Sequence, residues 1–271
     1  AAPPAGYYRF PSLHAETIVF TAEGDLWRVG VAGGTAQRLT THPGTEQLSA
    51  ISPDGQSLAF TAHYEGQSEV CVMPLAGGPP TRLTYEGEAS GALVRGWTPD
   101  GRILYSTPHY STLPSRQLVA LEPRTRDRRF LPLAQADEGA YDDTGHTLFF
   151  TRLAPQSSHA KRYQGGTAQN LWRYSPGEVE ATPLTANFAG TSRWPMWSQG
   201  RVYFASDRDG TMNLWSMQPD GTDLRPLTKH TDFGVKNPSL HRSRIAYQNG
   251  ADLWLLDLAT SRTAIVPITL A

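Results

Sequence analysis

The sequence has 271 residues, of which 39% are hydrophobic and 18% are charged. Its 24 Lys and Arg residues nearly balance 25 Asp and Glu residues, which excludes the broad basic surface of a nucleic-acid-binding protein. No apolar run reaches the roughly 20 residues of a membrane helix, so we expect no membrane contact. The 25 glycines and 21 prolines argue against a helical bundle, because both residues destabilise helix interiors. The composition favours many short strands joined by turns, in one large or two ordinary domains.

Residues 1–6, rich in Ala and Pro, predict a disordered leader. Such small residues are typical of the mature side of a signal-peptide cleavage site, which favours a periplasmic or secreted location slightly over a cytoplasmic one. The single cysteine, Cys71, excludes an intrachain disulfide.

From Tyr7 onward, one unit occurs six times. A unit contains a turn such as Ser52-Pro53-Asp54-Gly55, then an apolar run, then a strand with a pair such as Leu26-Trp27. The apolar residues that close the units follow one another at intervals of 41 to 51 residues: Leu39, Leu83, Leu133, Leu184, Leu227 and Ile268. A period of this length with four strand-like runs is typical of a propeller blade.

The sequence therefore predicts an all-β fold, a six-bladed β-propeller with four antiparallel strands per blade. The predicted blades span residues 7–40, 46–84, 93–133, 137–185, 193–228 and 235–269. Pro-Ser-Leu-His occurs at residues 11–14 and again at 238–241, so the first and last blades begin in the same phase. We expect a ring closed without strand exchange, by packing of blade 1 on blade 6, with the last outer strand near residues 265–268.

The connections predict two unlike faces. In a four-stranded meander, the turns that follow the first and third strands share one face, and here they are short. The connections on the other face are long, and function usually lies where a rigid scaffold displays such loops. The longest, residues 153–169 in blade 4, carries Lys161, Arg162 and Tyr163. We expect it to contact a partner or ligand; a self-packed surface loop is the alternative.

Cationic residues are predicted at one mouth of the central channel. Arg9, Arg193 and Lys236 hold equivalent positions, where the first strand of a blade enters from the loop-rich face, and Asp137 holds that position in blade 4. Arginine can hold a carboxylate through paired N–H donors. These residues predict a mildly basic site for a peptide, with ordinary solvated charges at the rim as the alternative.

No catalytic or metal-binding motif is present: the sequence lacks a nucleophile elbow, a Walker loop, an H-E-x-x-H helix and a dinucleotide-binding fingerprint. We therefore expect the chain to have no catalytic residue, no cofactor and no metal site. The basic run Arg124-Thr125-Arg126-Asp127-Arg128-Arg129 falls in the last turn of blade 3, where it is either solvated or docked on another domain.

Three stretches carry a family resemblance: Phe10-Pro11-x-Leu13-His14, Lys161-Arg162-Tyr163-x-Gly165-Gly166-Thr167 and Trp194-Pro195-Met196-Trp197. Together with the Asp-Leu-Trp strands at 25–27 and 252–254, they resemble the N-terminal six-bladed propeller of the tricorn protease family. The resemblance implies a non-catalytic domain of a serine peptidase, which gates or recognises peptides and packs on the catalytic domains. Peptides and those remaining domains are the implied partners. A TolB-like protein-binding module is the alternative, because TolB-type propellers share the Ser-Pro-Asp-Gly turns.

Overall fold

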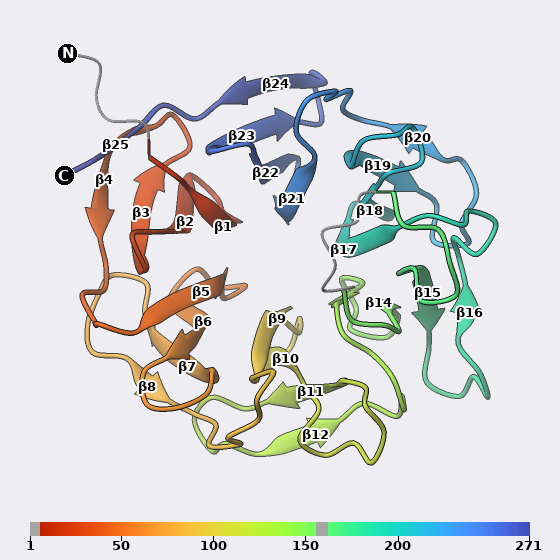
Figure 1. Cartoon of the computed structure of the whole chain (residues 1–271), viewed down its shortest axis with the longest axis horizontal. Helices are drawn as coiled ribbons and strands as arrows, with labels where there is room; N and C mark the ends of the chain where they lie inside the picture. The colour runs from red at the N-terminus through yellow and green to blue at the C-terminus, as the bar shows by residue number, and fades with distance from the viewer. Residues whose placement is uncertain (1–5, 156–161) are drawn as a thin grey trace.

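A computed structural model describes residues 6–155 and 162–271, which form six β-sheets arranged in a ring (Figure 1). In each sheet the first strand lies nearest the centre and the fourth lies at the rim. These two described segments contain no helix, and therefore none long and apolar enough to cross a membrane. The predicted all-β, six-bladed fold is confirmed. Residues 1–5 of the predicted leader lie outside the described residues.

Blade 1 consists of β1 (Arg9–His14), β2 (Thr17–Ala22), β3 (Asp25–Gly30) and β4 (Gly34–Arg38). Blade 2 consists of β5 (Thr45–Ile51), β6 (Ser57–His63), β7 (Glu69–Pro74) and β8 (Thr81–Arg82). Blade 3 consists of β9 (Leu93–Trp97), β10 (Ile103–Thr107), β11 (Gln117–Leu121) and β12 (Arg128–Phe130).

Blade 4 consists of β13 (Gly139–Tyr141), β14 (Leu148–Thr151), β15 (Leu171–Tyr174) and β16 (Thr182–Pro183). Blade 5 consists of β17 (Ser192–Ser198), β18 (Arg201–Ser206), β19 (Asn213–Met217) and β20 (Arg225–Pro226). Blade 6 consists of β21 (Val235–His241), β22 (Arg244–Asn249), β23 (Asp252–Asp257) and β24 (Arg262–Ile265), and β25 (Ile268–Leu270) follows it.

The second strand of every blade contributes a fully buried aromatic side chain at the same position: Phe20, Phe60, Tyr105, Phe150, Phe204 and Tyr247. In four blades this residue lies directly opposite the Trp of the third strand, as Phe20 does opposite Trp27. Cross-strand aromatic pairs of this kind stabilise a sheet and supply a large buried area. The recurring Leu-Trp pairs therefore mark the strands whose side chains pack between neighbouring blades.

Threonines near the end of a unit complete the outer edge of the blade. In four blades the hydroxyl oxygen accepts the backbone N–H of a third-strand residue at 2.9 Å: Thr40 from Leu26, Thr84 from Val70, Thr185 from Leu171 and Thr228 from Leu214. The outer strands of these blades are only two to five residues long and leave those donors without a ladder partner. Because a buried N–H needs an acceptor, the repeated Thr has a structural cause.

The seam between blade 6 and blade 1 closes the ring. Blade 6 keeps its own four strands and β1 pairs with β2, so the N-terminal strand does not complete blade 6, as predicted. The prediction that the ring closes by packing alone is wrong, because β25 joins the sheet of blade 1 as a fifth strand. The expected position of the last outer strand is wrong: β24 ends at Ile265, and β25 pairs in parallel with β4 at the rim of blade 1 (Figure 1). Hydrogen bonds from Tyr8 to Ala251 and from Gly34 to Pro267 also cross the seam. The seam therefore does not depend on packing alone.

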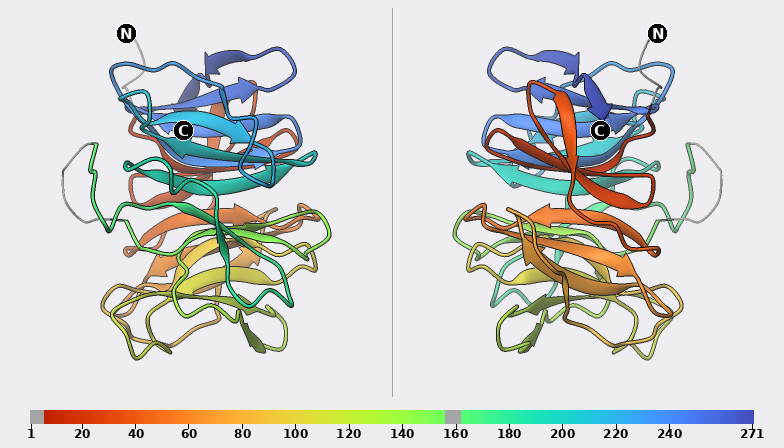
Figure 2. Two further views of the ribbon diagram at one scale, coloured as in Figure 1. Left: turned by 90° about the vertical axis from the view of Figure 1, so that its right-hand side faces the viewer. Right: turned by 90° about the vertical axis from the view of Figure 1, so that its left-hand side faces the viewer.

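Viewed from the side, the strand ends and connections define two faces of the ring (Figure 2). The inner strands begin at one face, which we call the loop-rich face. The connection between β14 and β15 emerges there, and its described parts are residues 152–155 and 162–170.

Candidate functional site

The inner strands enclose a channel of about 560 Å³ to which all six blades contribute. Its wall combines aromatic and charged side chains, among them Phe10, Trp97, Tyr141, Trp194, Arg95, Glu138, Asp142 and Arg242. Concave sites that mix apolar surface with a few polar groups are typical of ligand binding. The channel is therefore the candidate functional site.

Left-handed backbone conformations mark the loop-rich mouth of the channel, the end at which the inner strands begin. Phe10, Leu48, Trp194 and Asn237 have φ between 46° and 54°, and each lies at a shift in the pairing of its inner strand. Asn tolerates this conformation, whereas for bulky residues it is rare and costs about 1–3 kcal/mol. All four residues line the channel. The bulges thus place side chains in the wall at the expense of local strain.

Arg193 forms an ion pair with Glu138 of the neighbouring blade. Its Nε donates to Glu138 Oε1 at 3.1 Å, and the backbone N–H of Trp194 donates to Oε2 at 2.8 Å. The guanidinium also lies 3.9 Å from the centre of the Trp194 ring. Only 16% of the Arg193 side chain and 4% of the Glu138 side chain are exposed. Arg193 therefore connects blade 5 to blade 4, and its charge is already balanced.

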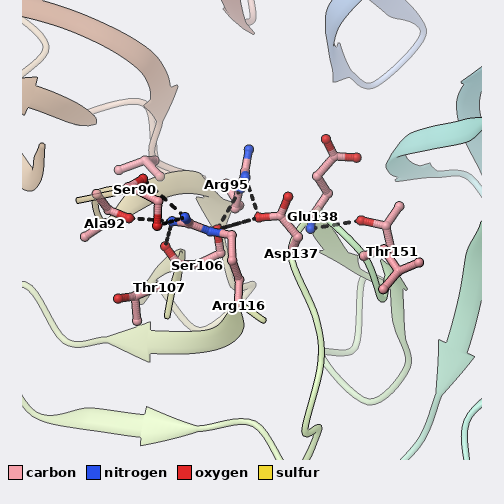
Figure 3. Close-up of polar contacts among 12 residues, drawn as sticks. Ser90, Ala92, Arg95, Ser106, Thr107, Arg116, Asp137, Glu138 and Thr151 are labelled. Atoms are coloured by element: carbon pink, nitrogen blue, oxygen red, sulfur yellow. Dashed lines mark hydrogen bonds and ion pairs between the residues drawn. The ribbon is translucent and has the colours of Figure 1, made fainter. Parts of the chain in front are cut away.

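Asp137 is fully buried between blades 3 and 4. Its Oδ1 contacts the guanidinium groups of Arg95 and Arg116 and accepts the Ser106 hydroxyl at 2.7 Å (Figure 3). Burial opposes ionisation, but Arg95, Ser106 and Arg116 together hold the pKa of this carboxyl below its usual value. Burial also lowers the pKa of Arg116 to about 10. The carboxylate and its two arginines form a buried link between these blades.

Figure 3 shows that neighbouring residues of blade 4 point their carboxyl groups in different directions, Asp137 toward Arg95 and Arg116 and Glu138 away from them. Adjacent residues of an extended chain alternate in this way. Blade 4 therefore binds arginines from both neighbours, Arg95 and Arg116 from blade 3 and Arg193 from blade 5. The sequence did not reveal the role of Arg95, because only the folded ring brings these blades together.

Arg9 and Lys236 lie on the neighbouring inner strands of the seam. The Arg9 guanidinium is 5.5 Å from the centres of both the Tyr7 and the Phe10 rings, and Lys236 is exposed. Within residues 6–155 and 162–271, neither cation has an ion-pair partner. The unbalanced positive charge among the three predicted cations is therefore on the seam side of the mouth.

The predicted contact site in blade 4 is described only in part, because Lys161 lies outside the described residues. Arg162 donates from Nε to the backbone oxygen of Gly210 at 2.6 Å, and the Tyr163 hydroxyl lies 2.8 Å from Thr167 Oγ1. Arg162 and Tyr163 are not part of the channel wall. This end of the connection is tied to blade 5.

Two histidines face each other across the seam at the opposite mouth. The ring centres of His14 and His241 are 4.3 Å apart, and His14 Nε2 lies 3.1 Å from the Pro53 oxygen. Burial, together with His14, Arg242 and Arg244, lowers the pKa of His241 to about 4. The matching Pro-Ser-Leu-His stretches were the sequence signal for this pairing. No group of three or more potential metal ligands occurs in the described part of the chain.

The fold and its channel define a six-bladed β-propeller. Residues 5–262 match the family described as the tricorn protease N-terminal beta propeller domain, and the chain belongs to that family. It is 37% identical over 255 residues to tricorn protease homolog 1 of Streptomyces coelicolor, a match that covers 93% of this chain and 23% of that protein.

Solved structures show the same fold. The crystal structure of the tricorn protease matches with a TM-score of 0.87 and 23% identity, covering 97% of this chain and 26% of that one. TolB from Acinetobacter baumannii matches with a TM-score of 0.63 and 18% identity, covering 86% of this chain and 56% of that one. This chain spans about a quarter of the length of the tricorn relatives that it matches.

Proposed function

We propose that this propeller is a non-catalytic part of a tricorn-type peptidase that recognises peptide substrate or product at its channel and gates the passage of that peptide. The observation that carries the proposal is the pair of cations at the loop-rich mouth, Arg9 and Lys236. Neither has an ion-pair partner within residues 6–155 and 162–271, and their chain neighbours Phe10 and Asn237 line the channel. The Arg9 guanidinium lies beside the exposed Tyr7 ring and the channel-lining Phe10 ring, which suits a peptide terminus with an apolar side chain. No contact in the described residues favours the TolB-like alternative.

The anionic group that suits this position is a peptide carboxylate. A guanidinium and an ammonium on neighbouring strands attract it, and Arg193 does not compete because Glu138 already binds it. The connection that carries Lys161, Arg162 and Tyr163 emerges on the same face, and we include it in the proposal as a flank of the peptide path.

Titration of a fluorescent peptide with a free carboxyl end tests the proposal. We expect Arg9→Ala and Lys236→Ala each to weaken binding about fivefold, which corresponds to about 1 kcal/mol. Lys229→Ala, which changes an exposed lysine in the connection between β20 and β21, is the matched control and should bind like the unchanged chain. An amidated peptide should bind the unchanged chain more weakly. Equal affinity for the two peptides, or no binding at all, refutes carboxylate recognition.

A further inference from the structure

An exposed aromatic surface lies at the rim between blades 2 and 3. Of the nine large hydrophobic side chains that are exposed in the described residues, four belong to this region: Tyr85, Tyr110, Leu113 and Phe130. Their exposed fractions are 65%, 38%, 53% and 50%. Single exposed apolar residues are ordinary, whereas a group of them is typical of an interaction surface. We call this group, with residues 124–129, the blade 3 rim.

The aromatic part of the blade 3 rim is held by contacts beneath it. The Tyr110 ring meets the Phe130 ring edge-on at 4.8 Å, and His109 packs on Tyr110 at 4.7 Å. His109 in turn lies 3.2 Å from Glu88. Tyr85 covers the Arg82 guanidinium at 4.4 Å. Because these side chains are already fixed, a partner would lose little conformational entropy by ordering them.

Strand β12 extends the blade 3 rim toward a basic turn. Side chains alternate along a strand, so Arg128 and Phe130 share one face of β12. Arg128 donates from Nε to the Tyr105 hydroxyl at 3.3 Å on that face. The turn before β12 carries Arg124 and Arg126, which are exposed. Four residues of strand span about 13 Å, so the aromatic and basic parts fit within one docking footprint.

The basic turn gives its end of the blade 3 rim a positive charge, because residues 122–129 hold four arginines against Glu122 and Asp127. Glu86, which accepts the hydroxyls of Tyr105 and Thr107, and Glu88, beside His109, place negative charge near the aromatic end. The side chains of Arg124 and Arg126 form no ion pair within the described part of the chain. Tyr, Phe and Arg are the residues enriched in protein interfaces. A matching partner surface would present carboxylates beside an apolar ridge.

The size of the relatives indicates which partner this is. This chain covers 23% of the Streptomyces relative and 26% of the tricorn protease chain, so three quarters of each lies elsewhere in those proteins. No residue of the blade 3 rim named here lines the channel, and a domain docked there leaves the channel open. We propose that the blade 3 rim binds the remaining part of the larger peptidase through an acidic, apolar surface. This inference rests on the proposed function, because it assumes a tricorn-type partner.

Sedimentation velocity tests the inference directly. The probe is the part of the Streptomyces relative outside its matched quarter, expressed separately and mixed with this chain. We expect a one-to-one complex that the double variant Tyr110→Ser/Phe130→Ser weakens at least tenfold. Arg124→Glu should weaken it severalfold, more strongly at low salt than at high salt. Val179→Ser is the matched control, because Val179 is 99% exposed on a turn of blade 4.

Three outcomes overturn the inference: no complex with the unchanged chain, a complex that the double variant leaves intact, or self-association that the double variant abolishes. The last outcome would assign the blade 3 rim to a second copy of the chain. Thermal melting first confirms that each variant is folded. Peptide titration of the same variants separates the two proposals. If a variant loses docking but still binds the peptide, the defect lies at the blade 3 rim. If the chain docks but binds no peptide, only the channel proposal is refuted.

Discussion

The two sides of the loop-rich mouth use charge in opposite ways. On the side of blades 3 to 5, Arg95 and Arg193 are bound by the blade 4 carboxylates of Asp137 and Glu138 and are largely buried. On the seam side, Arg9 and Lys236 have no carboxylate partner among residues 6–155 and 162–271. Equivalent positions in the repeat therefore differ in their pairing. Arg193 connects two blades through Glu138, whereas Arg9 and Lys236 keep the positive charge that the proposed function assigns to a peptide carboxylate.

The largest expected effect comes from breaking the buried link at Asp137. Asp137→Asn leaves Arg95 and Arg116 buried without a carboxylate, and we expect the free energy of unfolding to fall by about 3–5 kcal/mol. Urea denaturation measures this change. Asp143→Asn, an exposed position in the same blade, is the control and should change stability little. If Asp137→Asn lowers the free energy of unfolding by less than 1 kcal/mol, the buried pairs on the side of blades 3 to 5 do not stabilise the ring more than the unpaired cations at the seam do.

The same link predicts sensitivity to acid. The pKa of Asp137 is lower in the folded state than the usual aspartate value of about 3.9. The ionised side chain therefore makes its full contribution to the free energy of unfolding above about pH 3.9. The contribution is lost as the pH falls below about 4 toward the folded pKa. Urea denaturation at several pH values should show that this acid-dependent loss is smaller in Asp137→Asn.

At the seam, removing β25 should have an intermediate effect. Deletion of residues 267–271 removes the parallel pairing with β4 and the acceptors of Tyr8 and Gly34. At about 1 kcal/mol for each net hydrogen bond, we expect a loss of about 2–3 kcal/mol. Thermal and urea denaturation measure it. Deletion of Ala271 alone should change stability little, and an equally small effect of the longer deletion would mean that packing alone closes the ring.

A smaller effect is expected from His241 at the seam. The pKa of His241 in the folded state, about 4, lies below the usual histidine value of about 6.5. The neutral side chain therefore makes its full contribution to the free energy of unfolding above about pH 6.5, and this contribution is lost as the pH falls toward 4. Because the side chain is partly exposed, solvent screening reduces the effect to roughly 1 kcal/mol. His241→Asn should flatten stability across this pH range, whereas His146→Asn, in an exposed turn of blade 4, should not. Identical pH curves for His241→Asn and the unchanged chain would contradict this.

The smallest effect on stability is expected for Lys236→Ala. The side chain is exposed and has no ion-pair partner in the described part of the chain, so unfolding should change by less than about 0.5 kcal/mol. If Lys236→Ala also weakens peptide binding, the cations on the seam side bind a ligand, in contrast to Arg95 and Arg193, which connect blades. A large loss of stability would mean that Lys236 connects blades as Arg193 does.

The architecture was predictable because a blade is a local unit. The spacing of the closing residues, the Asp-Gly turns and the Leu-Trp strands all arise from contacts within one blade or with its nearest neighbour, so the six-bladed fold could be predicted. The equivalence of Arg9, Arg193 and Lys236 was visible for the same reason. The position of β25 was not, because a parallel pairing between the last residues and β4 does not repeat along the chain.

The contacts that the residues at the loop-rich mouth make could not be predicted from the sequence. Arg193 and Glu138 are 55 positions apart, and they meet only because the folded ring places blade 5 beside blade 4. The left-handed bulges were hidden for a different reason. Asn237 is a residue that commonly adopts this conformation, but Phe10, Leu48 and Trp194 are among those that rarely do. Their conformation is imposed by the ring rather than by local preference.

The bulges also bear on how such a sequence evolves. Glycine at residue 10, 48 or 194 would relieve about 1 kcal/mol or more of backbone strain at each position. Glycine would also lose more conformational entropy on folding and forfeit the apolar contacts of the side chain, of which Trp194 packs against the core of blades 5 and 6. Each such replacement would remove a side chain from the channel wall. An evolving chain can therefore relax the backbone at these positions only by widening the opening that Phe10, Leu48 and Trp194 shape.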